Sequence, residues 1–142
     1  MTAEFPLAVH ALVYLLHTGR ITPSQELADN ICTNPARVRK VMTKLHRAGL
    51  AESVRGQGSG YRCGGETAAV TLGTVLRSLE EEPLSMSWRS GDMDRECLIS
   101  SGMGAIMDGI YGQLNRQCME TLESMTIGDL THQIFDRKKE TT

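Results

Sequence analysis

The stretch 34–50, NPARVRKVMTKLHRAGL, constrains the fold most, because it predicts a helix with one apolar and one basic side. A residue before proline avoids the α region and proline suits the first turn, so Thr33 or Asn34 should cap a helix that begins at Pro35. With about 100° per residue, one arc is apolar: Val38, Val41, Met42 and Leu45. A second arc is basic: Arg37, Lys40, Lys44 and Arg47. One side of this helix is therefore expected to pack while the other stays in water.

The residues on either side of this helix complete a recognisable order of elements. Two earlier helices are predicted, one apolar almost all round at 6–17 and one within 22–30. After the basic helix, residues 50–54 and 60–63 predict two short strands joined by a glycine-rich loop. Two helices, a tight break, a basic helix and a hairpin are the order of a winged helix-turn-helix. The third helix would then enter the major groove of DNA.

Charge along the chain supports this interpretation. The formal net charge is −2, yet residues 35–62 carry +6 and the remainder −8. The alternative, an ordinary solvated helix face, would mix acids with the bases, whereas Glu52 is the one acid in this segment. A concentrated basic patch on an acidic chain is typical of a nucleic-acid binder. The residues predicted to contact double-stranded DNA are Thr33, Asn34, Arg37, Arg39, Lys40, Lys44, Arg55, Gln57 and Tyr61.

The C-terminal half predicts a second unit built on one long helix. A fourth helix is expected between a cap at Thr71 and Pro83, followed by a polar loop and a long helix over 98–124. A final short helix is expected after it, with Thr126 and Asp129 in a capping-box relation. The apolar stripe of the long helix needs a partner surface, so we predict a homodimer. The predicted dimerisation residues are Met103, Met107, Ile110, Leu114, Cys118 and Leu122. The fold class is thus mainly α with a small β-hairpin wing, divided into a winged domain (1–82) and an effector loop with dimerisation helices (83–142).

The chain carries no sign of export or membrane insertion. No apolar run approaches the roughly 20 residues that span a bilayer, and the N-terminus has no basic segment before an apolar one. We therefore expect a cytoplasmic protein with reduced thiols and no membrane partner. The four cysteines, at positions 32, 63, 97 and 118, form no CxxC pair, so a structural zinc site is not predicted.

The segments ALVYLL, SQELADNICTNPARVRKVMTKLHRAGL and SVRGQGSGY, in this order, resemble the Rrf2 family of bacterial transcription regulators. The resemblance covers nearly the whole chain and includes TLGTVLRSLE and the late C…L…TIGDL pattern. It implies a homodimeric winged-helix protein that binds a partly palindromic operator, usually as a repressor. It also implies a response to a redox, metal-cluster or small-molecule signal.

One departure from the family bears on the cofactor. Cluster-binding members carry three closely spaced cysteines in the loop before the long helix, whereas this chain has only Cys97 there. An iron–sulfur cluster normally takes four ligands, mostly thiolates. We therefore predict no cofactor and no metal, with ligation by other groups or across a dimer as the alternative.

Two cysteines are candidates for redox sensing. Cys32 lies just before the DNA-reading helix, where modification would move that helix, although a small apolar plug in the turn is the alternative. Cys97 opens the long helix, which favours a thiolate, while neighbouring acids oppose it. The two could meet across a dimer. Cys63 and Cys118 are expected to pack.

The sequence as a whole predicts a cytoplasmic, dimeric DNA-binding repressor that senses oxidants or electrophiles through cysteine. The alternatives are a cluster- or ligand-responsive regulator of the same fold and an adaptor that grips another protein. An enzyme is not predicted, because paired carboxylates, a nucleophile–base motif and a phosphate loop are all missing from the sequence.

Overall fold

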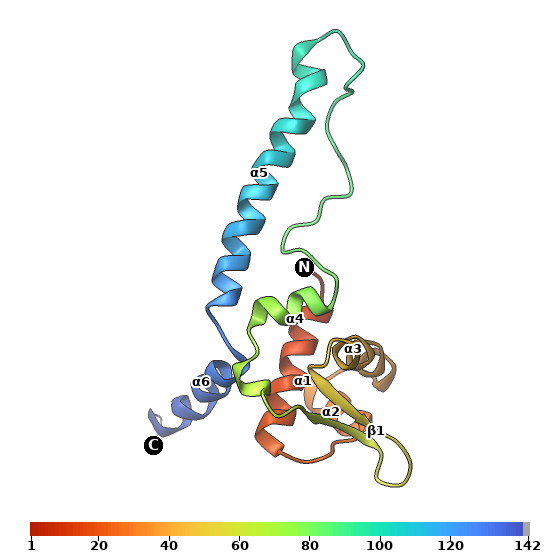
Figure 1. Ribbon diagram of the computed structural model, residues 1–142, viewed down its shortest axis with the longest axis vertical. Coiled ribbons are helices and arrows are strands. Elements are labelled where there is room, and N and C mark those ends of the chain that lie inside the picture. Colours follow the sequence, from red (N-terminus) through yellow and green to blue (C-terminus); the bar gives the residue numbers. More distant parts are fainter. Residues whose placement is uncertain (141–142) are drawn as a thin grey trace.

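The computed structural model describes residues 1–140, and the side chains of residues 1–137. Helices dominate it, with one two-stranded antiparallel hairpin (Figure 1). Along the chain the elements are α1 (Glu4–Thr18), α2 (Ser24–Ile31), α3 (Pro35–Arg47), β1 (Ala51–Val54), β2 (Gly60–Cys63), the short 3-10 helix η1 (Thr67–Ala69), α4 (Leu72–Ser78), α5 (Leu98–Glu123) and α6 (Ile127–Glu140). The predicted fold class, helical with a hairpin wing, is confirmed.

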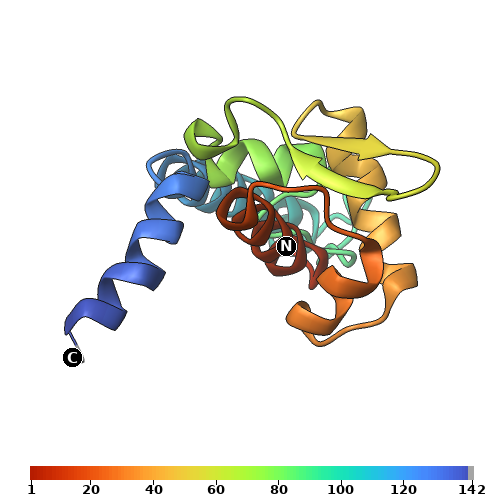
Figure 2. The ribbon, with the colours of Figure 1, turned by 90° about the horizontal axis from the view of Figure 1, so that it is seen from below.

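The core of the winged domain forms around α1, which lies among the other elements of the domain (Figure 2) and buries Phe5, Leu7, Ala8, Ala11, Leu12 and Leu15. Leu12 and Leu15 of α1 have no exposed surface, and the predicted apolar arc of α3 is buried against them and α2. Helix α1 begins two residues earlier than predicted, at Glu4, and Gly19 ends it in a left-handed conformation. The early start matters because it brings the Glu4 side chain next to α3.

Helix α3 starts as the sequence predicts. The Asn34 side chain accepts a hydrogen bond from the backbone N–H of Arg37 at 2.9 Å, with Pro35 in the first turn. The cap fixes where the helix begins and therefore which side chains point outward. The fourth helix, by contrast, ends earlier than predicted. Helix α4 stops at Ser78, because Glu80 takes a left-handed backbone conformation well before Pro83.

The hairpin is held to the helical body through β2. Tyr61 and Thr22 exchange two backbone hydrogen bonds of 2.8 Å. Thr22 therefore forms an antiparallel bridge to β2, next to the β1–β2 hairpin. Gly60 precedes this contact, and a Cβ there would lie 2.4 Å from the Thr22 carbonyl oxygen. Only glycine allows this approach, so Gly60 lets β2 lie directly against the segment between α1 and α2.

The loop of residues 83–97 runs outward from the winged domain, and α5 returns alongside it toward the domain (Figure 1). The 26 residues of α5 correspond to a length of about 39 Å at about 1.5 Å per residue. At its C-terminal end the chain re-enters the domain, where Leu72 and Met125 share a backbone hydrogen bond and Ile127 is fully buried. The predicted capping box of α6 is confirmed, with Thr126 and Asp129 bonded reciprocally at 3.0 Å. None of the helices in the described part of the chain is long and apolar enough to cross a membrane.

Candidate nucleic-acid interface

The outward face of α3 is basic and exposed. Arg37, Arg39, Lys40 and Arg47 are all exposed, and the wing lies beside this helix. Asn34 is exposed at the entrance of α3, where Thr33 accepts a hydrogen bond from the Arg37 guanidinium at 3.4 Å. Among the described side chains, no carboxylate lies within ion-pairing distance of Arg37, Arg39 or Arg47. We define these four exposed cations together with Lys44 as the basic face.

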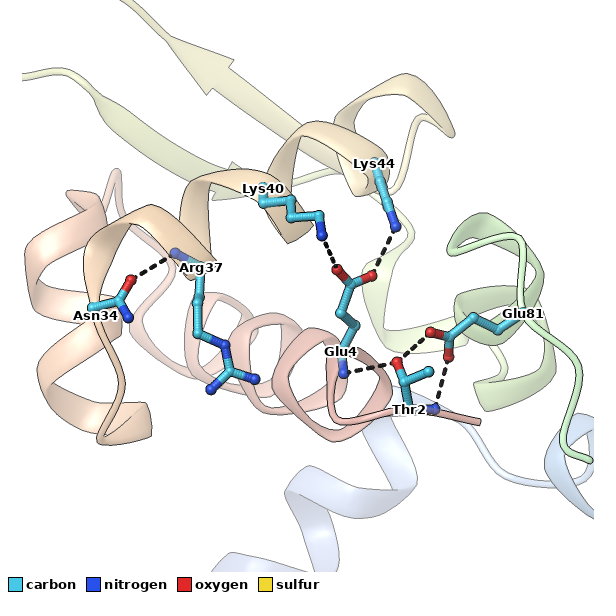
Figure 3. A network of polar contacts seen from close by, with 7 residues as sticks. All are labelled: Thr2, Glu4, Asn34, Arg37, Lys40, Lys44 and Glu81. Carbon is cyan, nitrogen blue, oxygen red and sulfur yellow. Dashed lines mark hydrogen bonds and ion pairs between the residues drawn. The ribbon is translucent and has the colours of Figure 1, made fainter. Parts of the chain in front are cut away.

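Two lysines of the basic face are paired with an acid from outside it (Figure 3). The Lys44 Nζ donates to Glu4 at 2.7 Å, and the Lys40 Nζ lies 3.2 Å from the other carboxylate oxygen. Hydrogen bonding from Lys44 is the main cause that lowers the pKa of Glu4, with Lys40 adding to it and partial burial opposing it. The +6 counted from the sequence is therefore partly neutralised in space by a residue that the count did not include.

The Glu4 carboxylate is held in place by the turn that precedes α1 (Figure 3). Thr2 accepts a hydrogen bond from the Glu4 backbone N–H at 3.2 Å, and its own hydroxyl donates to Glu81. The Thr2 backbone N–H donates to the second Glu81 oxygen at 3.1 Å. Glu81 follows α4, so this chain of contacts links α4, the start of α1 and α3.

The predicted wing residues occupy two different environments. Arg55 and Gln57 are exposed in the loop between β1 and β2. Tyr61 is half-buried against the core, and burial raises the pKa of its phenol while the positive charge of Arg39 opposes that shift. Arg62 of β2 is paired with Glu52 of β1, directly opposite it. Among the described residues, Arg55 at the wing tip is thus the one basic group of the wing outside an ion pair.

Side-chain hydrogen bonds hold the 83–97 loop against α5. Asn115 brackets Leu84, accepting from its backbone N–H at 2.7 Å and donating to its carbonyl at 3.1 Å. Farther along, Arg89 donates to Asp108 at 3.1 Å and crosses Gly104, where a Cβ would lie 2.5 Å from the guanidinium carbon. Trp88, beside this crossing in sequence, is 76% exposed. The loop is thus ordered on α5 while it presents an apolar side chain to solvent.

The four cysteines are free and fall into two groups. Cys32 and Cys97 are exposed, whereas Cys63 and Cys118 are half-buried, with Cys63 packed against the core. Cys97 is the N-cap residue of α5, and hydrogen bonds from the backbone N–H groups of Ser100 and Ile99 lower the pKa of its thiol. Cys32 ends α2 in a left-handed conformation with φ +66°. The apolar-plug alternative for Cys32 is therefore wrong, because its side chain is not buried.

The predicted dimerisation stripe is uneven in its exposure. Met103, Ile110 and Leu114 are exposed, and Met107 and Cys118 are half-buried. Leu122 packs partly against the core of its own protomer. Leu98 and Ile99 at the start of α5 are 86% and 72% exposed, although they lay outside the predicted stripe. The apolar surface without a partner within the protomer is therefore concentrated in the N-terminal part of α5.

A groove of about 750 Å³ lies between α1 and α6. It is mainly apolar and is lined by Phe5, Val9, Val13 and Phe135, among others. Phe135 also stacks on His17, with ring centroids 4.2 Å apart. This stacking holds α6 against the C-terminal part of α1.

The donor groups of the protomer do not fit an iron–sulfur cluster. Over the described residues, no three His, Cys, Asp or Glu side chains converge on a common point. Cys97 is the single cysteine of the 83–97 loop, and the other three lie just after α2, in β2 and in α5. A cluster that needs mostly thiolate ligands lacks them within one protomer.

The buried three-helix core, the basic face of α3 and the adjacent hairpin define a winged helix-turn-helix protein. The chain matches the model of the Rrf2 family, described as iron-dependent transcriptional regulators, over residues 1–133. It belongs to the Rrf2 family of transcriptional regulators.

Individual relatives agree with this assignment. The HTH-type transcriptional regulator IscR of Vibrio cholerae serotype O1 is 26% identical over 132 residues, which is 92% of this chain and 73% of the relative. A solved structure from Lactobacillus plantarum has a TM-score of 0.78 at 22% identity, covering 100% of both chains. CymR, the global cysteine regulator of B. subtilis, has a TM-score of 0.67 at 21% identity, covering 92% of this chain and 95% of CymR. The two structures show that the fold is shared.

The sequence did not predict two sets of contacts: the pairing of Glu4 with the basic face, and the bonds from Asn115 and Asp108 that hold the 83–97 loop on α5. Glu4 lies 36 residues before Lys40 and carries no local signal of a contact with it. Asn115 and Asp108 resemble ordinary solvated positions of a long helix. Glycines at 102, 104, 109 and 112 were noticeable in the sequence, and one of them, Gly104, marks where the loop crosses α5.

Proposed function

We propose that this protein is a homodimeric repressor, acting in the cytoplasm, that releases its operator when a cysteine thiol is oxidised or alkylated. The observation that carries the proposal is the exposed Cys97 thiol at the N-terminus of α5, with its lowered pKa. Thiolates are the reactive form of cysteine, and exposed, low-pKa thiols are the ones that oxidants select. Because the family regulates transcription, a reactive thiol on this scaffold gives the regulator a chemical input.

DNA binding in this proposal uses α3 and the wing. The basic face of α3 would enter the major groove, with Arg39 and Lys40 outward and Asn34 and Thr33 at the entrance. Arg55 and Gln57 at the wing tip would contact phosphate or the neighbouring minor groove. In a dimer the two α3 helices would lie about 34 Å apart, or at a multiple of that distance, to match successive major grooves on a partly palindromic operator.

Dimerisation is supported by the apolar surface of α5. Ile110, Leu114 and Met103 are exposed on one protomer, and Leu98 and Ile99 extend this surface to the start of the helix. Exposed apolar surface of this extent marks an interaction site. A second copy of the chain, presenting the same surface around a two-fold axis, is the simplest occupant.

The chemical step we propose begins at Cys97. Its thiolate attacks a peroxide oxygen, which leaves a sulfenic acid on the protein and releases hydroxide, or it adds directly to an electrophile. Condensation of the sulfenic acid with the Cys32 thiol of a second protomer would form a disulfide and release water. Both thiols are exposed, which such a pairing requires. Modification would shift the spacing of the two α3 helices and weaken operator binding.

The DNA-binding part is tested by titrating the protein with a labelled duplex from its own upstream region at several salt concentrations. We expect log K to fall linearly with log salt. Arg39→Gln or Arg55→Gln should lower the slope by roughly 0.9 for each phosphate that the variant no longer binds. An affinity that does not change with salt would contradict the role of the basic face.

The cysteine pairing is tested by a diagonal gel of peroxide-treated protein. Wild type should give a disulfide-linked dimer, and neither Cys32→Ser nor Cys97→Ser should do so. Loss of DNA binding on oxidation without any linked dimer would leave Cys97 as the sensor and remove Cys32 from the mechanism.

A further inference from the structure

The contacts of Glu4 place one carboxylate between two ammonium groups of the recognition helix (Figure 3). Lys44 is the more enclosed partner, with 32% of its side chain exposed, and it forms the shorter contact of 2.7 Å. Lys40 is 69% exposed and its contact is 3.2 Å. The Glu4 carboxylate thus occupies the position beside Lys40 and Lys44 where a DNA phosphate could otherwise bind.

Hydrogen bonds at the start of α1 also help to hold the Glu4 carboxylate beside the two lysines. Thr2 binds the Glu4 backbone N–H and at the same time bonds to Glu81 through its hydroxyl and its backbone N–H. The first turn of α1 is thus fixed relative to α4, and Glu4, with only 18% of its side chain exposed, has little freedom to swing away. A preorganised anion neutralises a lysine more effectively than a mobile surface acid does, because less side-chain entropy is lost on pairing.

DNA phosphate and the Glu4 carboxylate are alternative partners for the same ammonium groups. Phosphate contacts supply nearly all of the sequence-independent affinity of a DNA-binding protein. Arg39 and Arg47 on the same helix have no carboxylate within ion-pairing distance among the described side chains, so the restraint acts on Lys40 and Lys44 selectively. A residue that withholds two cations from phosphate lowers sequence-independent binding while base contacts by other residues persist.

We propose that Glu4 competes with DNA phosphate for Lys40 and Lys44 and so limits the sequence-independent part of the protein's affinity for DNA. The inference rests on the proposed DNA binding by α3 and adds a function for a residue outside the DNA-contacting segment. On a duplex of random sequence, the lysines can remain paired with Glu4 and make no phosphate contact. Alternatively, a lysine that contacts a phosphate must first leave the Glu4 carboxylate. On the operator, the remaining contacts of α3 and the wing still form.

The test compares Glu4→Gln with wild type on a labelled duplex of arbitrary sequence, over salt concentrations of about 50 to 200 mM. Glutamine keeps the shape of the side chain and removes its charge. We expect roughly two- to five-fold tighter binding, the equivalent of one exposed ion pair. We also expect log K against log salt to steepen by about 0.9 to 1.8, for one or two additional phosphates bound.

Matched variants separate this effect from overall charge. Glu66→Gln removes the same charge from an exposed residue that takes part in no ion pair among the described residues, and it should leave the slope unchanged. Adding Lys40→Gln to Glu4→Gln should cancel at least half of the added slope. Equal tightening by Glu66→Gln, or an unchanged or weaker affinity of folded Glu4→Gln, would overturn the proposal.

The outcomes also distinguish this proposal from DNA binding itself. Wild-type binding with no response to Glu4→Gln removes only the competitor role of Glu4, whereas no binding of duplex by either protein at low salt overturns both. Should Glu4→Gln fail to fold, Lys40→Gln and Arg39→Gln give the same test in the wild-type background. The partly neutralised Lys40 should then contribute less affinity for random duplex than Arg39, and an equal or larger contribution would contradict the proposal.

Discussion

The two ends of α5 differ in almost every physical respect. The C-terminal end is part of the domain core, where Leu122 and Met125 pack and Glu123 is paired with Arg77 and bonded to Thr71. The N-terminal end has the 83–97 loop on one side and exposes Leu98 and Ile99 to solvent, directly after an exposed Cys97. One helix thus joins an end with an exposed thiol to the body that carries α3, and in the proposed mechanism it transmits a change at Cys97 to the winged domain.

The largest expected effect separates Ile127, which begins α6 shortly after the C-terminal end of α5, from Ile99 at the N-terminal end of α5. Ile127→Ala should destabilise the protein by about 2–5 kcal/mol, because the side chain is fully buried where α5 rejoins the core. Ile99→Ala should change the stability of the protomer by less than about 0.5 kcal/mol. Urea unfolding at low protein concentration measures both. Equal losses would show that the two ends do not differ as described.

The next effect concerns the exposed apolar surface of α5. Ile110→Glu should weaken the proposed dimer by about 2 kcal/mol or more, which is roughly a thirty-fold rise in its dissociation constant. Gln113→Glu adds the same charge on an exposed position of the same helix and serves as the control. Sedimentation equilibrium gives both constants. A dimer that tolerates Ile110→Glu would place the interface elsewhere.

A smaller effect is expected where the loop is fastened to α5. Asn115→Ala removes both hydrogen bonds to Leu84 and should lower local stability by about 0.5–1.5 kcal/mol for each bond. Trypsin should then cleave after Arg89 or Arg95 several times faster, because local opening exposes the loop. Cleavage within the winged domain should not change, and a parallel increase there would indicate global unfolding instead.

The smallest effect is a shift in the pH dependence of Cys97 alkylation. Hydrogen bonds from the Ser100 and Ile99 N–H groups favour the thiolate, so its pKa lies below the ordinary cysteine value. The rate with iodoacetamide should therefore reach half of its plateau at a lower pH than that of a model cysteine peptide, since only the thiolate reacts. A midpoint at or above the peptide value would contradict the proposed stabilisation.

Local signals were enough to predict most of the fold. The Asn34–Pro35 junction, the apolar arc of α3, the hairpin glycines and the Thr126–Asp129 capping box all act within a few residues, and each is confirmed. The early end of α4 depends on a left-handed Glu80 that has no clear sequence signal.

Contacts between distant residues were not predictable in the same way. The basic segment was correctly placed on one exposed helix face, but its pairing with Glu4 depends on how α1 packs across α3. The exposure of Leu98 and Ile99 depends on α5 projecting from the domain. Charge counted along a chain therefore indicates where a binding face lies, and three-dimensional packing decides how much of that charge is free.

Control of DNA binding by Cys97 is tested most directly by measuring operator affinity before and after mild peroxide treatment. The probe is a duplex from the protein's own upstream region, and wild type is compared with Cys97→Ser, with Cys63→Ser as the control for a half-buried thiol. We expect peroxide to weaken binding by wild type and Cys63→Ser and to leave Cys97→Ser unchanged. Equal loss of affinity in Cys97→Ser, or no loss in wild type, would contradict the proposed control.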